Sequence, residues 1–139
     1  AAAKESTNQS YSYLHPNVKG KLANMHASIG GIYKDLGLYA EAADEFKKAL
    51  RLRPLFVDLK TSLGVVYRDM KDHSSSVREL EEAVRLNENY YQARIQLGLT
   101  YYTAGDNVKA KAQWQIVLDK NPEDKLARMY MSLLMAPSK

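Results

Sequence analysis

The chain has 139 residues, 45% of them hydrophobic, and its 20 Lys and Arg against 16 Asp and Glu give a formal net charge of +4. This length and composition suit one compact domain, and the lack of cysteine excludes a disulfide framework, a thiolate zinc site and a cysteine nucleophile while leaving the redox compartment open. No apolar run approaches the roughly 20 residues that cross a bilayer, and the basic residues are spread over alternating charge blocks, so we expect neither direct membrane insertion nor nucleic-acid binding.

The N-terminal segment 1–16 is polar, contains a His-Pro step and has no counterpart further along the chain. We expect it to form an arm, because chain ends that are not tied into a fold are usually poorly ordered. Since the chain begins Ala-Ala-Ala-Lys without Met, we also expect a processed or excised piece of a longer protein.

A helical period begins near Asn17, where apolar residues recur three or four positions apart. This spacing predicts an amphipathic helix over 17–36. Gly37 follows that helix and Gly105 follows a later one, as expected at a helix C-terminus, where the backbone often takes positive φ. Lys71 occupies the equivalent place in the middle of the chain.

The same period predicts six further helices, at 40–52, 57–70, 74–86, 91–104, 108–120 and 124–135. Asp72 and Asp106 precede two of them and are predicted to cap the free amides of the first turn. For the last helix we expect Asn121 to be the cap, with Pro122 in the first turn, where its missing N–H donor is harmless.

The helices repeat in pairs at a spacing of 34 residues. A glycine inside a helix costs about 1 kcal/mol relative to alanine, so its recurrence at one phase indicates that the two helices of a pair approach closely there. We expect small residues of the second helix, such as Ala42, to lie opposite. The recurring positions are Gly30, Gly64 and Gly98; Tyr33, Tyr67 and Tyr101; Ala42, Ser76 and Ala110; and Phe46, Leu80 and Trp114.

This pattern resembles the tetratricopeptide repeat (TPR) family, because small and large residues recur in step over three consecutive units. The resemblance implies an all-α fold, a right-handed α-α superhelix or TPR solenoid of about seven helices. It also implies that the first helices of the repeats line a concave groove for an extended peptide or a partner helix. The expected divisions are an arm 1–16, a repeat domain 17–135 with repeats 23–56, 57–90 and 91–124, a capping helix 124–135 and a tail 136–139.

Residues on the open face of the first helices are predicted to line this groove. Ile95, Leu99 and Tyr102 indicate a pocket for an apolar or aromatic side chain of a partner. Lys34 and Arg68 would flank it and meet acidic or carbonyl groups. The alternative is that the capping helix or the arm covers this patch within the same chain. The predicted site residues are Asn24, Lys34, Thr61, Arg68, Gln92, Ile95, Leu99, Tyr102 and Met129.

One binding mode of the family can be compared position by position. Members that grip the C-terminal carboxylate of chaperone peptides carry Lys and Asn in the first unit, Asn in the second, and Lys and Arg in the third. We expect that clamp to be absent here. The matching positions hold Ala27, Gly31, Ser62, Gln92 and Gln96.

Catalytic chemistry is not predicted. His15, His26 and His73 are scattered, no phosphate-binding loop or metal motif is present, and we expect no cofactor and no metal. The sequence therefore predicts a non-catalytic protein-protein interaction module, a scaffold or adaptor with a protein or peptide partner. The alternative is a structural module that self-associates into a homo-oligomer, its groove filled by its own arm or by a neighbouring copy.

Overall fold

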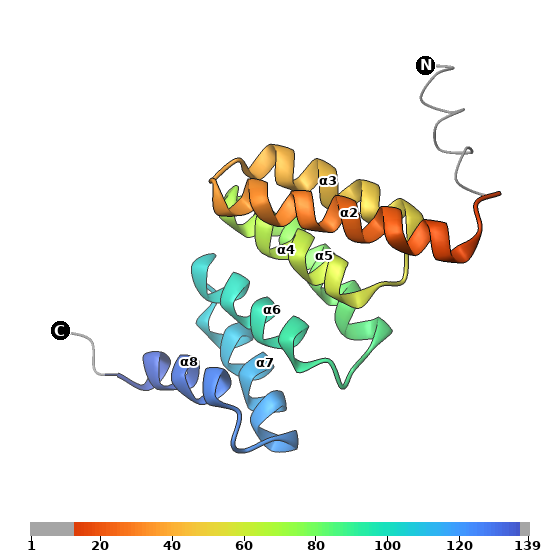
Figure 1. The fold of residues 1–139 in the computed structure, drawn as a ribbon. Helices are drawn as coiled ribbons and strands as arrows, with labels where there is room; N and C mark the ends of the chain where they lie inside the picture. Colours follow the sequence, from red (N-terminus) through yellow and green to blue (C-terminus); the bar gives the residue numbers. More distant parts are fainter. Residues whose placement is uncertain (1–12, 137–139) are drawn as a thin grey trace.

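The computed structural model describes residues 13–136, and within that range seven helices follow one another (Figure 1). Each bound lies within one residue of the expected one, and the all-helical repeat fold is confirmed. Residues 1–12 of the expected arm and 137–139 of the expected tail lie outside the described residues. The helices are α2 (Pro16–Asp35), α3 (Tyr39–Leu52), α4 (Val57–Asp69), α5 (His73–Leu86), α6 (Tyr91–Thr103), α7 (Asn107–Lys120) and α8 (Lys125–Met135).

The helices pack as consecutive antiparallel pairs, α2 with α3, α4 with α5 and α6 with α7 (Figure 1). Each pair then packs on the next through α3 with α4 and α5 with α6, and α8 closes the array on α7. The first helices α4 and α6 also contact each other directly. A solenoid of this kind buries each unit only against its neighbours, so its surfaces are set by local stacking.

Close approach at the repeated glycines is confirmed, although the group opposite them is not the predicted small residue. A Cβ at Gly30 would lie 3.1 Å from the Phe46 ring, and a Cβ at Gly64 would lie 2.6 Å from Leu80 Cγ. The large side chain of the second helix therefore occupies the space that the missing Cβ leaves, since a close-packed interior fills such space with side-chain atoms.

The first helices end as predicted. Gly37 and Gly105 have φ of 77° and 89°, and Lys71 takes the same left-handed conformation with φ of 67°. Asp72 and Asp106 cap the second helices, accepting hydrogen bonds from the backbone N–H groups three residues on, at 3.2 and 3.1 Å.

The N-cap residue predicted for α8 was wrong. Asp124, not Asn121, is the N-cap, and its carboxylate accepts a hydrogen bond from Ala127 N at 3.0 Å. Asn121 ends α7, donating its backbone N–H to Val117 O at 2.7 Å, so Pro122 lies in the turn between the helices. A carboxylate directly before the helix satisfies a free first-turn amide, which leaves no capping role for Asn121.

Candidate functional site

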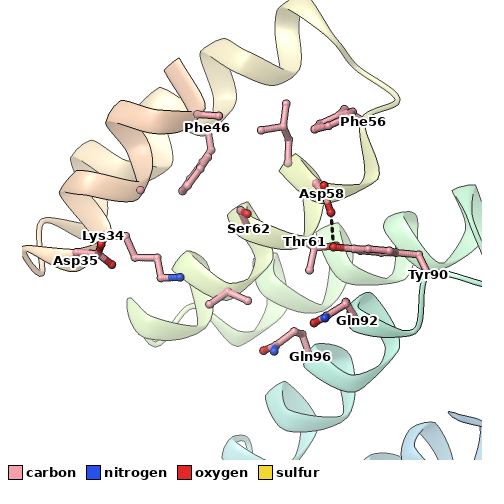
Figure 2. Close-up of a pocket in the computed structure, with 14 residues that line it drawn as sticks. Lys34, Asp35, Phe46, Phe56, Asp58, Thr61, Ser62, Tyr90, Gln92 and Gln96 are labelled. Atoms are coloured by element: carbon pink, nitrogen blue, oxygen red, sulfur yellow. Dashed lines mark hydrogen bonds between the residues drawn. The ribbon is translucent and has the colours of Figure 1, made fainter. Parts of the chain in front are cut away.

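A cavity of 510 Å³ opens between the first helices of the three pairs, and we call it the α2–α4–α6 groove (Figure 2). Side chains of all three helices face it, together with residues of α3 and of the two connections that lead into α4 and α6. Its lining is Ala27, Gly31, Lys34, Asp35, Phe46, Phe56, Asp58, Leu59, Thr61, Ser62, Val65, Tyr90, Gln92 and Gln96.

Two polar walls face each other across the groove. Figure 2 shows Lys34 and Asp35 on the α2 side and the amides of Gln92 and Gln96 on the α6 side. Charges of both signs therefore stand on one wall and neutral donors and acceptors on the other. This combination suits a peptide backbone, whose N–H and C=O groups require both kinds of partner.

Aromatic side chains supply the apolar part of the groove. Phe46 is 4% exposed and reaches the lining from α3, while the half-buried Phe56 precedes α4. The guanidinium of Arg53 lies 4.0 Å from the centroid of the Phe56 ring, a cation–π contact that holds the ring in place.

Tyr90 joins the second and third pairs at the edge of the groove. Its hydroxyl donates a hydrogen bond to the Asp58 carboxylate (Figure 2). Burial of the ring and this hydrogen bond to a carboxylate both raise the pKa of Tyr90 above its usual value, so the phenol remains a donor at neutral pH.

Gln96 presents an unsatisfied acceptor. Its side-chain Oε1 is buried and has no hydrogen-bond partner among the described residues. Its backbone carbonyl, by contrast, accepts a hydrogen bond from Arg68 Nη1 at 3.2 Å. A buried acceptor without a partner loses its water contacts and gains nothing in return, so this oxygen is energetically unfavourable where it lies.

Lys34, Thr61 and Gln92, three of the predicted site residues, line this groove together. Asn24 is exposed on α2 and does not belong to the lining. Arg68 was expected to meet a partner, but its guanidinium contacts Gln96 O and, at 3.5 Å, Thr100 Oγ1 of α6. Burial lowers the pKa of Arg68, although the neighbouring Asp69 opposes this.

The predicted residues of the C-terminal half lie elsewhere. Ile95 was expected on the open face, but it is 2% exposed because α8 packs over it, with Ala127 and Tyr130 in the same apolar cluster. The Tyr102 ring lies 6.2 Å from the centroid of Trp114, and Leu99 is half-buried. Met129 is 51% exposed on α8. The capping helix therefore covers Ile95, one of the three residues of this patch.

Phe56 and Tyr90 are lining residues that the predicted site omitted. Both precede a first helix and therefore lie in connections, outside the helical-wheel argument. They are 34 residues apart. Their recurrence as aromatic residues at one phase of the repeat is the signal that could have identified them.

The five positions of the chaperone-carboxylate clamp all line the groove. They are Ala27, Gly31, Ser62, Gln92 and Gln96. None is a cation, so these positions offer small surfaces, a hydroxyl and amides. Within residues 13–136, no group of His, Asp and Glu could hold a metal ion, and none of the helices there is long and apolar enough to span a bilayer.

Comparisons with known proteins agree with this geometry. The family described as tetratricopeptide repeat matches residues 23–54 and 57–90. The first TPR domain of Spaghetti (RPAP3), bound to an HSP90 peptide, superposes with a TM-score of 0.76 at 23% identity, over 84% of this chain and 92% of that one. A search of curated proteins gives no match.

Two further solved structures are similar. The second TPR domain of human RPAP3, in complex with an HSP70 peptide, has a TM-score of 0.76 at 17% identity, over 88% of this chain and 100% of that one. The Sgt2 TPR domain from Aspergillus fumigatus has a TM-score of 0.74 at 19% identity, over 80% of this chain and 75% of that one. At these identities the likeness establishes the fold.

Proposed function

Because the chain is a tetratricopeptide repeat protein, we propose that its α2–α4–α6 groove binds an extended segment of a protein partner and that the chain is a non-catalytic interaction module. The observation that carries this proposal is the groove lining, in which Lys34 and Asp35 of α2 face the side-chain amides of Gln92 and Gln96 of α6. The exposed amide of Gln92 would bond peptide groups of a bound segment from one wall, and Lys34 and Asp35 would bond them from the other.

The chemistry of the lining favours an internal segment over a free C-terminus. Two of the similar structures hold peptides that end in Glu-Glu-Val-Asp, and a terminal carboxylate needs cations around it. Here the clamp positions are neutral, and Lys34 stands beside Asp35. The Phe46 and Phe56 rings would receive one apolar side chain of the segment.

Two glycines of α2 give a matched test. A Cβ at Gly31 and a Cβ at Gly20 would each meet open space, with nothing within 4 Å, but only Gly31 lines the groove. Gly31→Leu should therefore fill the groove and lower partner affinity by tenfold or more, while Gly20→Leu should leave affinity unchanged. Affinity chromatography with the two variants and the wild-type chain, read by mass spectrometry, identifies groove ligands as proteins lost only with Gly31→Leu.

Two further measurements complete the test. The peptide Ser-Arg-Met-Glu-Glu-Val-Asp with a free C-terminus should bind no better than its C-terminally amidated form, measured by calorimetry. Sedimentation with and without residues 1–16 addresses self-association. Partners that bind Gly31→Leu and wild type equally, or a groove that opens to ligands only after removal of 1–16, would contradict the proposal and favour the self-association module.

A further inference from the structure

A polar contact recurs between the two helices of every pair. The fourth residue of each 34-residue unit is basic or His, and it contacts an acceptor that lies 19 positions on, in the second helix. These contacts are buried or half-buried. They are His26 Nδ1 to Glu45 Oε2 at 2.6 Å, Lys60 Nζ to Glu79 Oε2 at 3.9 Å, and Arg94 Nη1 to Gln113 Oε1 at 2.9 Å. Lys60 also pairs with Glu82 Oε1, at the shorter distance of 3.1 Å.

The residue after each acceptor is the large apolar one that fills the space at the glycine. Phe46 follows Glu45, Leu80 follows Glu79, and Trp114 follows Gln113. Small or β-branched residues stand four positions before and three positions after the large one in each helix. Every second helix thus presents the same face to its first helix: small residue, acceptor, large residue, small residue.

The helix α8 has the register of a first helix. Arg128 lies 34 residues after Arg94, and Ser132 lies 34 residues after Gly98. Within residues 13–136, however, each of the second helices α3, α5 and α7 is already packed on its own first helix. Arg128 Nη1 instead meets Glu123 Oε2 at 3.3 Å, and that Glu side chain is 86% exposed.

The face of α8 that a second helix would cover is open. It borders a cavity of 350 Å³ that we call the α8 seat, lined by Leu118, Arg128, Met131, Ser132, Met135 and Ala136. Met135 is 69% exposed. At the same phase as Met131, Leu97 of α6 is 2% exposed. An apolar surface with a cation at its edge is typical of an interaction site.

We propose that the α8 seat binds an amphipathic helix of a partner protein, which completes a fourth helix pair. The partner helix carries a small residue, Glu or Gln three positions later, a large apolar residue directly after that, and a small residue three positions further on. The Glu pairs with Arg128, and the large residue packs against Ser132. Charge complementarity with Arg128 and continuity with the three existing interfaces define this occupant.

Ser132 also selects the size of the large residue. It bears a Cβ where the other first helices have glycine, and a Cβ there is accommodated best opposite Phe46, at 3.1 Å, compared with 2.6 Å opposite Leu80 and a still shorter distance opposite Trp114. A partner helix with Phe should therefore fit better than one with Trp. The sequence of α3 (Tyr39–Leu52) contains the whole pattern with Phe, so a peptide of that sequence is a suitable probe.

The test uses this peptide, fluorescently labelled, and the full chain, with binding measured by anisotropy. Ser132→Gly should tighten binding several-fold, and Ser132→Leu should weaken it tenfold or more. Arg128→Glu should weaken binding by about twofold to fivefold, as for loss of a solvent-accessible ion pair. A peptide in which Lys replaces the Glu at the acceptor position should bind the Arg128→Glu variant more tightly than it binds the wild-type chain.

The controls separate this seat from the groove. Gly31→Leu should leave peptide binding unchanged, and circular dichroism should show equal melting for the α8 variants, whose side chains lie at the surface. Absence of binding at 1 mM peptide, or equal binding by Ser132→Gly and Ser132→Leu, overturns the proposal. A chain that dimerises through α8 in sedimentation, with dimerisation lost in Ser132→Leu, also overturns it by making a second copy the occupant.

Discussion

Replacement of Gly64 by alanine tests the packing of the helix pairs. The added Cβ would lie 2.6 Å from Leu80 Cγ and 2.9 Å from Cδ2. Leu80 is fully buried, so its branch point cannot move aside without displacing its neighbours. Overpacking of this kind costs about 1–3 kcal/mol, whereas alanine in place of a helical glycine contributes about 1 kcal/mol in the opposite sense. We expect the free energy of unfolding to fall by about 0–2 kcal/mol.

Gly31→Ala is the matched control, because it brings the same gain in helix propensity where a Cβ meets open space. Subtracting the control leaves the steric cost alone, a difference of about 1–3 kcal/mol between the two variants. Urea denaturation followed by circular dichroism at 222 nm measures both. Gly30→Ala, with its Cβ 3.1 Å from the Phe46 ring, should fall between them. Equal stability of the Gly64 and Gly31 variants would refute the argument that the missing Cβ makes room for Leu80.

Further predictions concern the surface, a helix end and a phenol. Leu99 and Tyr102 do not line the α2–α4–α6 groove, so replacing both with alanine should leave the affinity of a groove-bound partner unchanged while the circular dichroism spectrum is retained; a loss of affinity would contradict the placement of the partner in this groove alone. Lys71→Gly should stabilise the chain by about 0.5 kcal/mol in urea denaturation, because glycine accepts the positive φ at a lower cost, although it also gains freedom in the unfolded state. Burial and donation to Glu81 raise the pKa of Tyr101 to about 12. Its stabilising contribution should thus be complete below pH 10 and be lost as the pH rises through 12, and Tyr101→Phe should remove this part of the pH dependence of unfolding.

The helices and their pairing could be predicted from the sequence because their signals are local and repeated. Period, the caps of α5 and α7 and the glycine ends place each helix of residues 13–136 within one residue, and Lys71 adopts the backbone conformation of its glycine counterparts. The repeat also shows each structural position three times, so that a single departure, such as Lys71 in place of glycine, does not obscure the pattern.

The groove was only partly predictable because a helical wheel gives the direction of a side chain but not what stands in front of it. The helical wheel places Ile95 on the open side, yet α8 covers it. It places Arg68 there as well, but the guanidinium donates a hydrogen bond to the carbonyl of Gln96. Phe56 and Tyr90 come from connections, whose course depends on how successive pairs stack.

The α2–α4–α6 groove is bounded by helices of three different pairs, so no single pair sets its width. The two junctions between pairs set it, and the hydrogen bonds from Arg68 to Gln96 O and from Tyr90 to Asp58 belong to the second of them. A bound segment that contacts both α2 and α6 therefore connects the first helix pair to the third. The elastic energy of bending both junctions therefore becomes part of the binding free energy of that segment. Substitutions at Arg68 would change the width of the groove, and through it the affinity, without any contact between Arg68 and the ligand.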